Sequence, residues 1–152
     1  MLIEKFLFTT AAKHHLSNAA ILESWARMKE NNQDWKIAIF SDSQQAQFLK
    51  QNLSPRVFES YQAINPVYGA AKADFFRYCV CYLLGGVYLD IKSHISVPLN
   101  AILRHEDQCL ISQWDNKPGQ AHANTYGRHE EISHVMGGEF ICLLYTSDAA
   151  DE

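Results

Sequence analysis

The chain has 152 residues, of which 47% are hydrophobic and 20% are charged, and its formal net charge is −4. This length suits one domain with a substantial core, and the composition is typical of a soluble globular protein. The mild acidity argues against a nucleic-acid partner, which would favour a basic excess. No apolar run is long enough to span a bilayer, because Gly85 and Gly86 interrupt the longest one, Cys79–Leu89.

The cysteines and the N-terminus bear on the cellular compartment. The four cysteines form no Cys-x-x-Cys pair, which argues against a disulfide framework and against a zinc site. The opening MLIEKFLFTT has Glu4 before Lys5 and no apolar core followed by small residues, so it is typical of a first strand rather than a signal peptide. We therefore expect a protein of the reducing cytoplasm.

The first two expected elements are a strand and a helix. Leu2–Phe8 is a short apolar run typical of a buried strand. Leu16–Glu30 carries apolar residues near helical spacing, and Ser17 or Asn18 could cap that helix.

A second strand and helix follow. Trp35–Phe40 is rich in strand-forming residues, and Asp42 could cap a helix that ends at Leu49 or Lys50. The order strand, helix, strand, helix predicts an α/β unit with a parallel sheet.

The middle of the chain contains the clearest helix. A short helix is expected over Arg56–Ala63, followed by a long one over Gly69–Leu84. Gly85 and Gly86 end the long helix, since glycine readily adopts the left-handed conformation found after many helices. Val87–Ile91 is then expected to be a strand.

The last third is less regular. Gln108–Ser112 is expected to be a strand, Trp114–Glu131 a long polar loop, and Phe140 and Ile141 a final apolar run. Around these segments, Trp114, Asp115, Asn116 and Glu139 are candidates for contact with a ligand, although Trp114 could equally belong to the core. His94 follows Lys92 by two positions and could face the same site, but the favoured interpretation is an ordinary loop residue.

Four charged residues in the middle of the chain could form a binding site. Asp74 and Arg77 are three apart on the expected helix and share a face, and Asp90 and Lys92 are two apart in the expected strand and point to one side. Asp90 falls near the carboxyl end of that strand, where open α/β sheets bind ligands. The set could hold a polyhydroxylated ligand through charge-assisted hydrogen bonds. Spacing alone favours a second interpretation, in which Asp74 and Arg77 form only a surface ion pair.

Two stretches carry a family resemblance. Residues 70–78 read AAKADFFRY, and residues 85–92 read GGVYLDIK. They resemble the sugar-binding region of glycosyltransferase family 32, whose pattern is A-x-K-[AS]-D-x-x-R-Y, a helix, and then G-G-x-Y-x-D-x-D. Weaker similarity extends to Phe8 and to Trp35–Asp42, so that the likeness covers most of Leu2–Ile141.

The resemblance implies an α/β, GT-A-like (Rossmann-like) nucleotide-diphospho-sugar transferase fold, incomplete at its C-terminus. It implies a retaining glycosyltransferase, a hexosyltransferase, that moves sugar from UDP- or GDP-hexose to a glycan or lipid-linked acceptor. Bacterial members of the family make capsule and other cell-surface polysaccharides. The expected place is therefore the cytoplasm, with peripheral association at the inner face of the membrane.

The resemblance also assigns roles in donor binding. Asp74 and Arg77 match residues that contact the donor sugar. Phe8 and Thr9 are expected to line the nucleoside pocket. Tyr88 shares a face with Asp90, two positions later, so it either packs near the nucleotide or fills the core.

The motif departs from the family at its second carboxylate. Asp90 matches the first Asp, which is expected to contact the ribose, the sugar, or a metal through water, whereas Lys92 replaces the Asp that helps to bind Mn²⁺ or Mg²⁺. A charged lysine cannot ligate a metal, but it can neutralise part of the charge on a departing diphosphate. Either Asp90 and Lys92 act in catalysis without a metal, or other residues bind it, or the fold persists without activity.

The C-terminal residues Cys142–Glu152 resemble a translated sequencing-library adapter, and the alternative is a genuine acidic tail. We therefore expect a donor-binding part over 1–141 and a non-native tail over 142–152. Two other functions remain open: a nucleotide-sugar-binding module or inactive fragment without turnover, and an α/β domain of unrelated function. The unrelated domain would be favoured if Asp74, Arg77 and Asp90 did not converge on one site.

Overall fold

A five-stranded sheet forms the centre of the molecule in the computed structural model, which describes residues 4–93, 95, 97–104, 107, 109–111 and 140–143. The strands are β1 (Phe6–Thr10), β2 (Lys36–Phe40), β3 (Gly86–Leu89), β4 (Cys109–Ile111) and β5 (Phe140–Leu143), in the spatial order β2-β1-β3-β5-β4. β2, β1 and β3 are mutually parallel, whereas β5 runs antiparallel to both β3 and β4. The predicted parallel sheet is therefore present, with antiparallel pairing added at one side.

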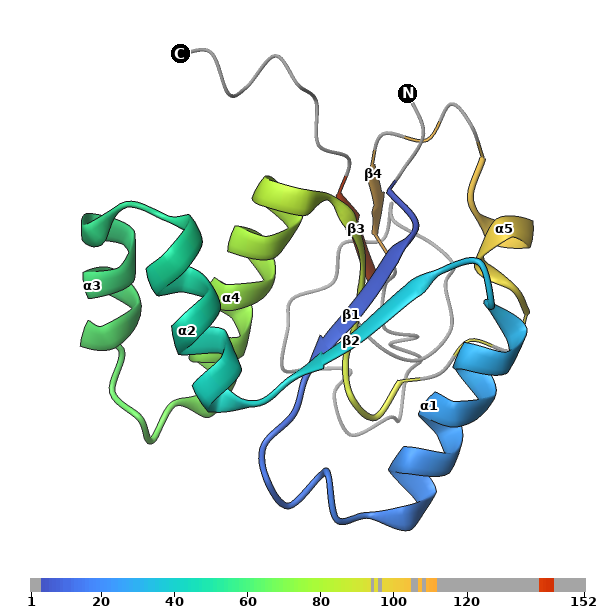
Figure 1. Cartoon of the computed structure of the whole chain (residues 1–152), viewed down its shortest axis with the longest axis horizontal. Coiled ribbons are helices and arrows are strands. Elements are labelled where there is room, and N and C mark those ends of the chain that lie inside the picture. Colours follow the sequence, from blue (N-terminus) through green and yellow to red (C-terminus); the bar gives the residue numbers. More distant parts are fainter. Residues whose placement is uncertain are drawn as a thin grey trace, which may run out of the picture.

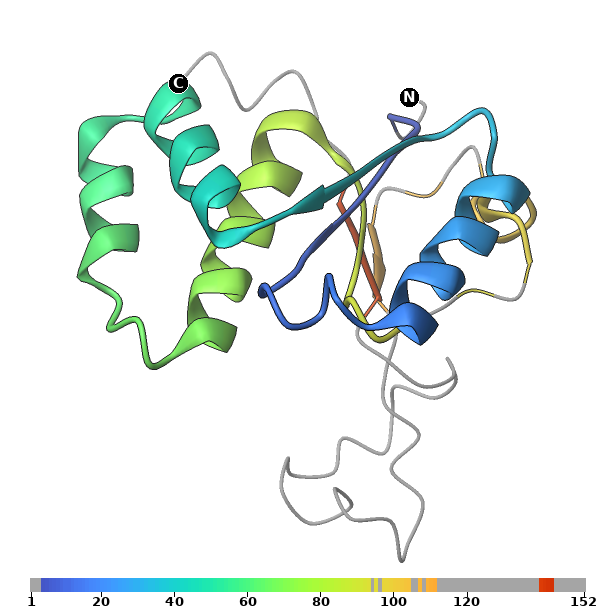
Figure 2. The same ribbon diagram turned by 60° about the horizontal axis from the view of Figure 1, so that its bottom comes forward.

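Helices cover both faces of this sheet (Figure 1). They are α1 (Ala19–Asn31), α2 (Asp42–Asn52), α3 (Pro55–Ala63), α4 (Gly69–Leu84) and α5 (Leu99–Ile102). The view in Figure 2 keeps α2, α3 and α4 on one side of the strands and α1 and α5 on the other. This arrangement agrees with the mixed α/β class that the order of elements predicts.

Each face of the sheet has its own apolar core, because successive strand residues point to opposite faces. Leu7 and Val87 pack with Trp25 and Met28 of α1, whereas Phe8 and Tyr88 belong to the core beneath α2–α4. The register of β1 and β3 pairs Leu7 with Val87 and Phe8 with Tyr88, which keeps the two sets apart. Tyr88 is thus directed toward α4.

The first strand lies later in the chain than the apolar run alone predicts. β1 spans Phe6–Thr10 rather than Leu2–Phe8, since its five residues pair with the whole of β2, from Phe6 opposite Lys36 to Thr10 opposite Phe40. Threonine suits a strand well, so two polar residues extend the element beyond its apolar part.

Local capping chemistry explains the starts of the first two helices. Asn18 caps α1, because its Oδ1 accepts hydrogen bonds from the N–H groups of Ala20 and Ile21 at 3.0 and 3.3 Å. The prediction that Asp42 caps α2 is wrong: Ser41 is the N-cap, and its N–H donates to the Gln44 side chain at 2.9 Å in a capping box. α2 also continues to Asn52, past the expected end at Leu49 or Lys50.

α4 has the bounds that the sequence predicts, Gly69–Leu84, and the two glycines after it have positive φ angles of 64° at Gly85 and 93° at Gly86. A Cβ at Gly86 would collide with the carbonyl oxygen of Phe6. Glycine is therefore required here both by the backbone conformation and by the close approach of β3 to β1.

The strand expected over Val87–Ile91 is shorter and ends at Leu89. The Ser93 N–H donates to the Asp90 carbonyl at 2.8 Å, which closes a turn over residues 90–93. Asp90 and Lys92 therefore lie in a turn, and the prediction that they share one side of a strand is wrong.

β5 spans residues on both sides of the predicted division between 1–141 and 142–152. That division stays a prediction. In the part of the chain that the structure describes, no helix is long and apolar enough to cross a membrane.

Candidate functional site

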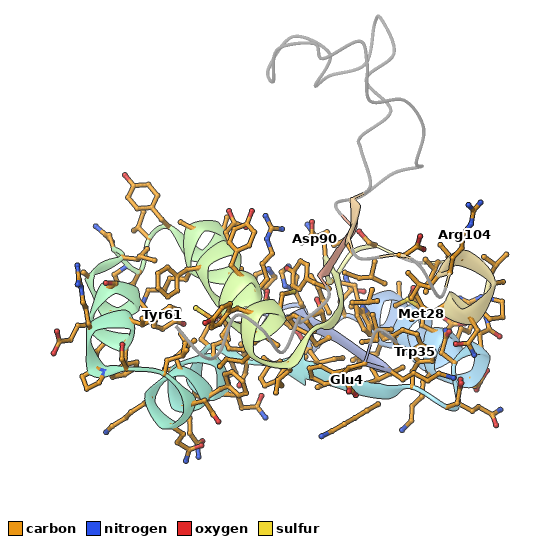
Figure 3. All side chains as sticks on the ribbon, turned by 90° about the horizontal axis from the view of Figure 1, so that it is seen from above. Glu4, Met28, Trp35, Tyr61, Asp90 and Arg104 are labelled. Atoms are coloured by element: carbon orange, nitrogen blue, oxygen red, sulfur yellow. The ribbon has the colours of Figure 1, made fainter. Side chains whose placement is uncertain are left out.

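The carboxyl ends of β1 and β3 lie next to each other, since the two strands are neighbours and parallel. Thr10 ends β1, and Asp90 directly follows β3. Figure 3 places Asp90 between the layer that contains Tyr61 and the layer that contains Met28. Ligands of open α/β sheets bind at such an edge.

Arg77 is the most constrained charged residue at this edge. Only 6% of its side chain is exposed, and its Nη2 lies 3.0 Å from Oδ1 of Asp74, whose side chain is 51% exposed. Its guanidinium also lies over the rings of Tyr88 and Tyr78, 5.3 and 5.4 Å from their centroids. The predicted shared face of Asp74 and Arg77 is confirmed, but a surface pair is the wrong description, because the arginine is buried.

Tyr88 connects Arg77 to Asp90. Its hydroxyl donates to Asp90 Oδ1 at 2.9 Å and lies 3.4 Å from the hydroxyl of Thr10. Burial raises the pKa of the Tyr88 hydroxyl well above its ordinary value, and the neighbouring Asp90 charge acts in the same direction. The tyrosine hydroxyl therefore stays protonated and donates a hydrogen bond to the Asp90 carboxylate.

These contacts bring the predicted residues together in one continuous series: Asp74, Arg77, Tyr88 and Asp90. Sequence reasoning missed Thr10, which the structure adds beside Tyr88. The alternation of β1 was the available signal, because Thr10 shares a face with Phe8, the register partner of Tyr88.

The two residues expected at the nucleoside pocket are fully buried, each with 0% exposure. Phe8 contacts the Tyr88 ring edge-on, with 5.4 Å between centroids, inside the core beneath α2–α4. The Thr9 hydroxyl donates to the Thr10 carbonyl at 3.4 Å. Contact of Phe8 and Thr9 with a nucleoside stays a prediction.

One protein family matches the chain over residues 18–109: the glycosyltransferase sugar-binding region containing the DXD motif. The chain belongs to this family. No curated protein and no solved structure matches it. The matched region includes Asp74, Arg77 and Asp90, and the mixed α/β architecture is compatible with a GT-A-like glycosyltransferase domain. The prediction of a glycosyltransferase with a sugar-binding region is therefore confirmed at the level of the family.

Lys92, which the resemblance places at the second Asp of the D-x-D pattern, is exposed in the turn after Asp90. The pKa of His15, in the loop after β1, is lowered mainly by burial, then by the neighbouring His14 and then by the charge of Lys92. The loop after β1 and the turn that carries Lys92 leave the same edge of the sheet, because β1 and β3 are parallel neighbours.

The turn that carries Asp90 and Lys92 is fixed from α1. Trp25 is buried, and its indole Nε1–H donates to the Ile91 carbonyl at 2.9 Å. Ile91 itself belongs to the core beneath α1. Sequence reasoning assigned Trp25 only to the apolar face of a helix, because no local signal pairs it with a turn 66 positions later.

A metal ion of the kind the family pattern implies requires several oxygen ligands. Among the described residues, no group of three or more His, Cys, Asp or Glu side chains could hold a metal ion. Asp90 accepts a hydrogen bond from Tyr88, and Asp74 is paired with Arg77. These residues do not by themselves fit Mn²⁺ or Mg²⁺. The minor candidates at His94, Trp114, Asp115, Asn116 and Glu139 lie outside the described residues.

Proposed function

We propose that this protein is a retaining glycosyltransferase of family 32, which transfers a hexose from UDP- or GDP-hexose to a glycan or lipid-linked acceptor. The proposed setting is cell-surface polysaccharide synthesis in a bacterium, in the cytoplasm or at the inner face of its membrane. Membership of the sugar-binding glycosyltransferase family supports the reaction class. The donor, the stereochemistry, the acceptor and the setting follow from the motif resemblance.

The observation that carries the proposal is the contact series from Asp74 to Asp90 at the carboxyl edge. Asp74 is half-exposed and uses one oxygen for Arg77, so its carboxylate can accept hydrogen bonds from sugar hydroxyls. Arg77 is held by Asp74 and by the Tyr88 ring, so its orientation is set before a ligand arrives. Asp90 is oriented in turn by the Tyr88 hydroxyl.

In the proposed reaction, the bond between the anomeric carbon and the diphosphate oxygen breaks, the acceptor oxygen bonds to the same face of the sugar, and the proton of the acceptor hydroxyl passes to the departing diphosphate. Negative charge then grows on the diphosphate. The exposed Lys92, two residues after Asp90, is suited to neutralise part of that charge as a point charge. A Mn²⁺ or Mg²⁺ ion held by Asp90 and residues elsewhere would supply the same neutralisation.

The test is turnover of a panel of nucleotide sugars, measured as released nucleotide, for the wild type and for Asp90→Asn. This variant keeps an oxygen that can accept from Tyr88 but removes the charge. We expect release from one or two donors and its loss in the variant, with UDP or GDP binding retained. Absence of binding by every donor to the folded wild type would refute the proposal.

The second candidate is a nucleotide-sugar-binding module without turnover, and Lys92 at the position of a metal ligand favours it. Donor binding with no release of nucleotide, with or without Mn²⁺, would support this module. Restoration of turnover in Lys92→Asp with added Mn²⁺ would identify the lysine as the cause.

A further inference from the structure

The loop between β1 and α1 forms a folded basic segment beside the site. It begins at Ala11, whose N–H donates to the Phe40 carbonyl at 2.9 Å, and it contains Lys13, His14 and His15. The His14 and His15 rings lie 4.0 Å apart. The Ser17 hydroxyl donates to the His14 carbonyl at 3.0 Å, so the loop is held by its own hydrogen bonds.

His14 and Lys92 act electrostatically on His15 of this loop. His14 and Lys92 both disfavour the charged form of His15 and so lower its pKa, after burial as the largest cause. In the described part of the chain, no carboxylate forms an ion pair with Lys13, His14 or Lys92. An anion placed beside Lys13 and Lys92 would gain two positive partners that no described carboxylate already pairs with.

The same loop borders an open pocket with a volume of about 550 Å³, lined by Lys13, His14, Leu16 and Ser17. That volume lies within the usual range for small-molecule sites. An ammonium group, an imidazole and a hydroxyl can all donate to phosphate oxygens, and Leu16 offers an apolar surface beside them.

The pocket and the contact series lie on different sides of one edge. Tyr88 faces α4, where Asp74 and Arg77 lie, whereas Ala11, the first residue of the loop, belongs with Ile91 to the core beneath α1. A ligand with a sugar at one end and a diphosphate next to it could therefore span the edge, with its charged part toward loop 11–18.

We propose that loop 11–18 and Lys92 bind the diphosphate of the nucleotide sugar, with Lys13 and Lys92 supplying positive charge that the family's metal ion otherwise supplies, and with His14 and Ser17 donating hydrogen bonds. The inference rests on the proposed function, because it names how that site holds its donor. It adds Lys13, His14 and Ser17 to the site and makes diphosphate binding independent of a divalent metal.

The experiment is calorimetric titration of the full chain with UDP, GDP, UMP and inorganic pyrophosphate, in EDTA and again with Mn²⁺. We expect UDP or GDP to bind in EDTA, and binding to weaken about tenfold in Lys13→Gln and in Lys92→Gln, since each loses a charge-assisted contact. The affinity for UMP should change less in these variants, because UMP carries only one phosphate. Lys50→Gln, on an exposed position of α2, is the matched control and should bind as the wild type does.

The outcomes separate the inference from the proposed function. Diphosphate binding that requires Mn²⁺ and is unchanged in Lys13→Gln and Lys92→Gln would overturn the inference and leave the proposed function intact. No binding of any nucleotide or nucleotide sugar under either condition, by a chain with native circular dichroism, would overturn both. Because Lys13 and Lys92 are exposed, their variants are expected to fold.

Discussion

Arg77 carries a buried positive charge between the Asp74 carboxylate and the Tyr88 ring. Such a charge is tolerated only where its partners offset the cost of removing it from water. Its planar guanidinium can stack on a ring and bind a carboxylate at once, which the ammonium of lysine cannot do. The shape of the donor site therefore depends on the arginine itself as well as on its charge.

Replacing Arg77 by lysine tests this dependence. We expect Arg77→Lys to lower the free energy of unfolding by about 1–3 kcal/mol, since the stack and a charge-assisted hydrogen bond are lost. Urea denaturation measures the change, and nucleotide-sugar affinity should fall with it. Unchanged stability together with unchanged affinity would show that a positive charge at position 77 is sufficient and that the guanidinium is not required.

Trp25 acts on the site through the turn that it holds. Trp25→Phe keeps an aromatic ring but removes the donor to the Ile91 carbonyl, which should cost about 1–2 kcal/mol and weaken nucleotide binding. Trp35→Phe is the matched control, because its Nε1–H donates to Asn100 at 3.0 Å, away from the turn. Calorimetric titration should show weaker nucleotide binding in Trp25→Phe alone. Equal effects in both variants would argue that Trp25 does not position the turn.

At the scale of elements, the connection between α4 and β3 is the one that most restricts which residues can occupy it. Gly86→Ala places a Cβ against the Phe6 carbonyl at a φ of 93°, so we expect a loss of about 1–3 kcal/mol in the free energy of unfolding. Gly69→Ala is the control: a Cβ there meets nothing within 4 Å, and alanine favours the helix. The thermal unfolding midpoint of Gly69→Ala should equal or exceed that of the wild type. Equal losses in Gly69→Ala and Gly86→Ala would contradict this account.

The loop after β1 should make stability depend on pH. Its His15 has a folded pKa below the ordinary 6.5, so the unfolded chain binds more protons between these values. Stability is then complete above pH 6.5 and falls as the pH drops below it. Urea midpoints measured from pH 7.5 to 5.5 should decline less in His15→Gln than in the wild type, and parallel slopes would refute the assignment.

Local signals predicted some of these elements and missed others. α4 was predicted to its last residue because its apolar surface ends at two glycines, which are local features. The end of β3 was not, since the turn over residues 90–93 depends on Trp25, a partner 66 positions away. Ser41 and Asp42 are adjacent and both suit a helix N-cap, so composition alone could not separate them.

The same distinction holds for the site. The pairing of Asp74 with Arg77 follows from helical spacing and was predicted. The burial of Arg77 and the hydrogen bond from Tyr88 to Asp90 were not, because both depend on how β3 pairs with β1 and on how α4 packs over it. Sequence reasoning singled out Asp74, Arg77, Tyr88 and Asp90, and the tertiary structure gave their order of contact and added Thr10 and Trp25.

On the scale of the whole molecule, the two faces of the sheet present different polar side chains at its carboxyl edge. In the proposed donor complex, Asp74 and Arg77 on the α4 side bind the sugar, and loop 11–18 on the α1 side binds the phosphates. Only a ligand with both parts would use both sides. Under the two proposals above, a nucleotide sugar would use both sides of the edge, whereas a free sugar or a nucleotide alone would use one.

The most direct test of this account is the affinity difference between a nucleotide sugar and its own nucleoside diphosphate, measured by calorimetric titration of the wild type and of Asp74→Ala. The account predicts that the wild type binds the nucleotide sugar more tightly and that the difference disappears in the variant, while diphosphate affinity stays the same. Equal affinities in the wild type, or a difference that persists without the Asp74 carboxylate, would contradict it.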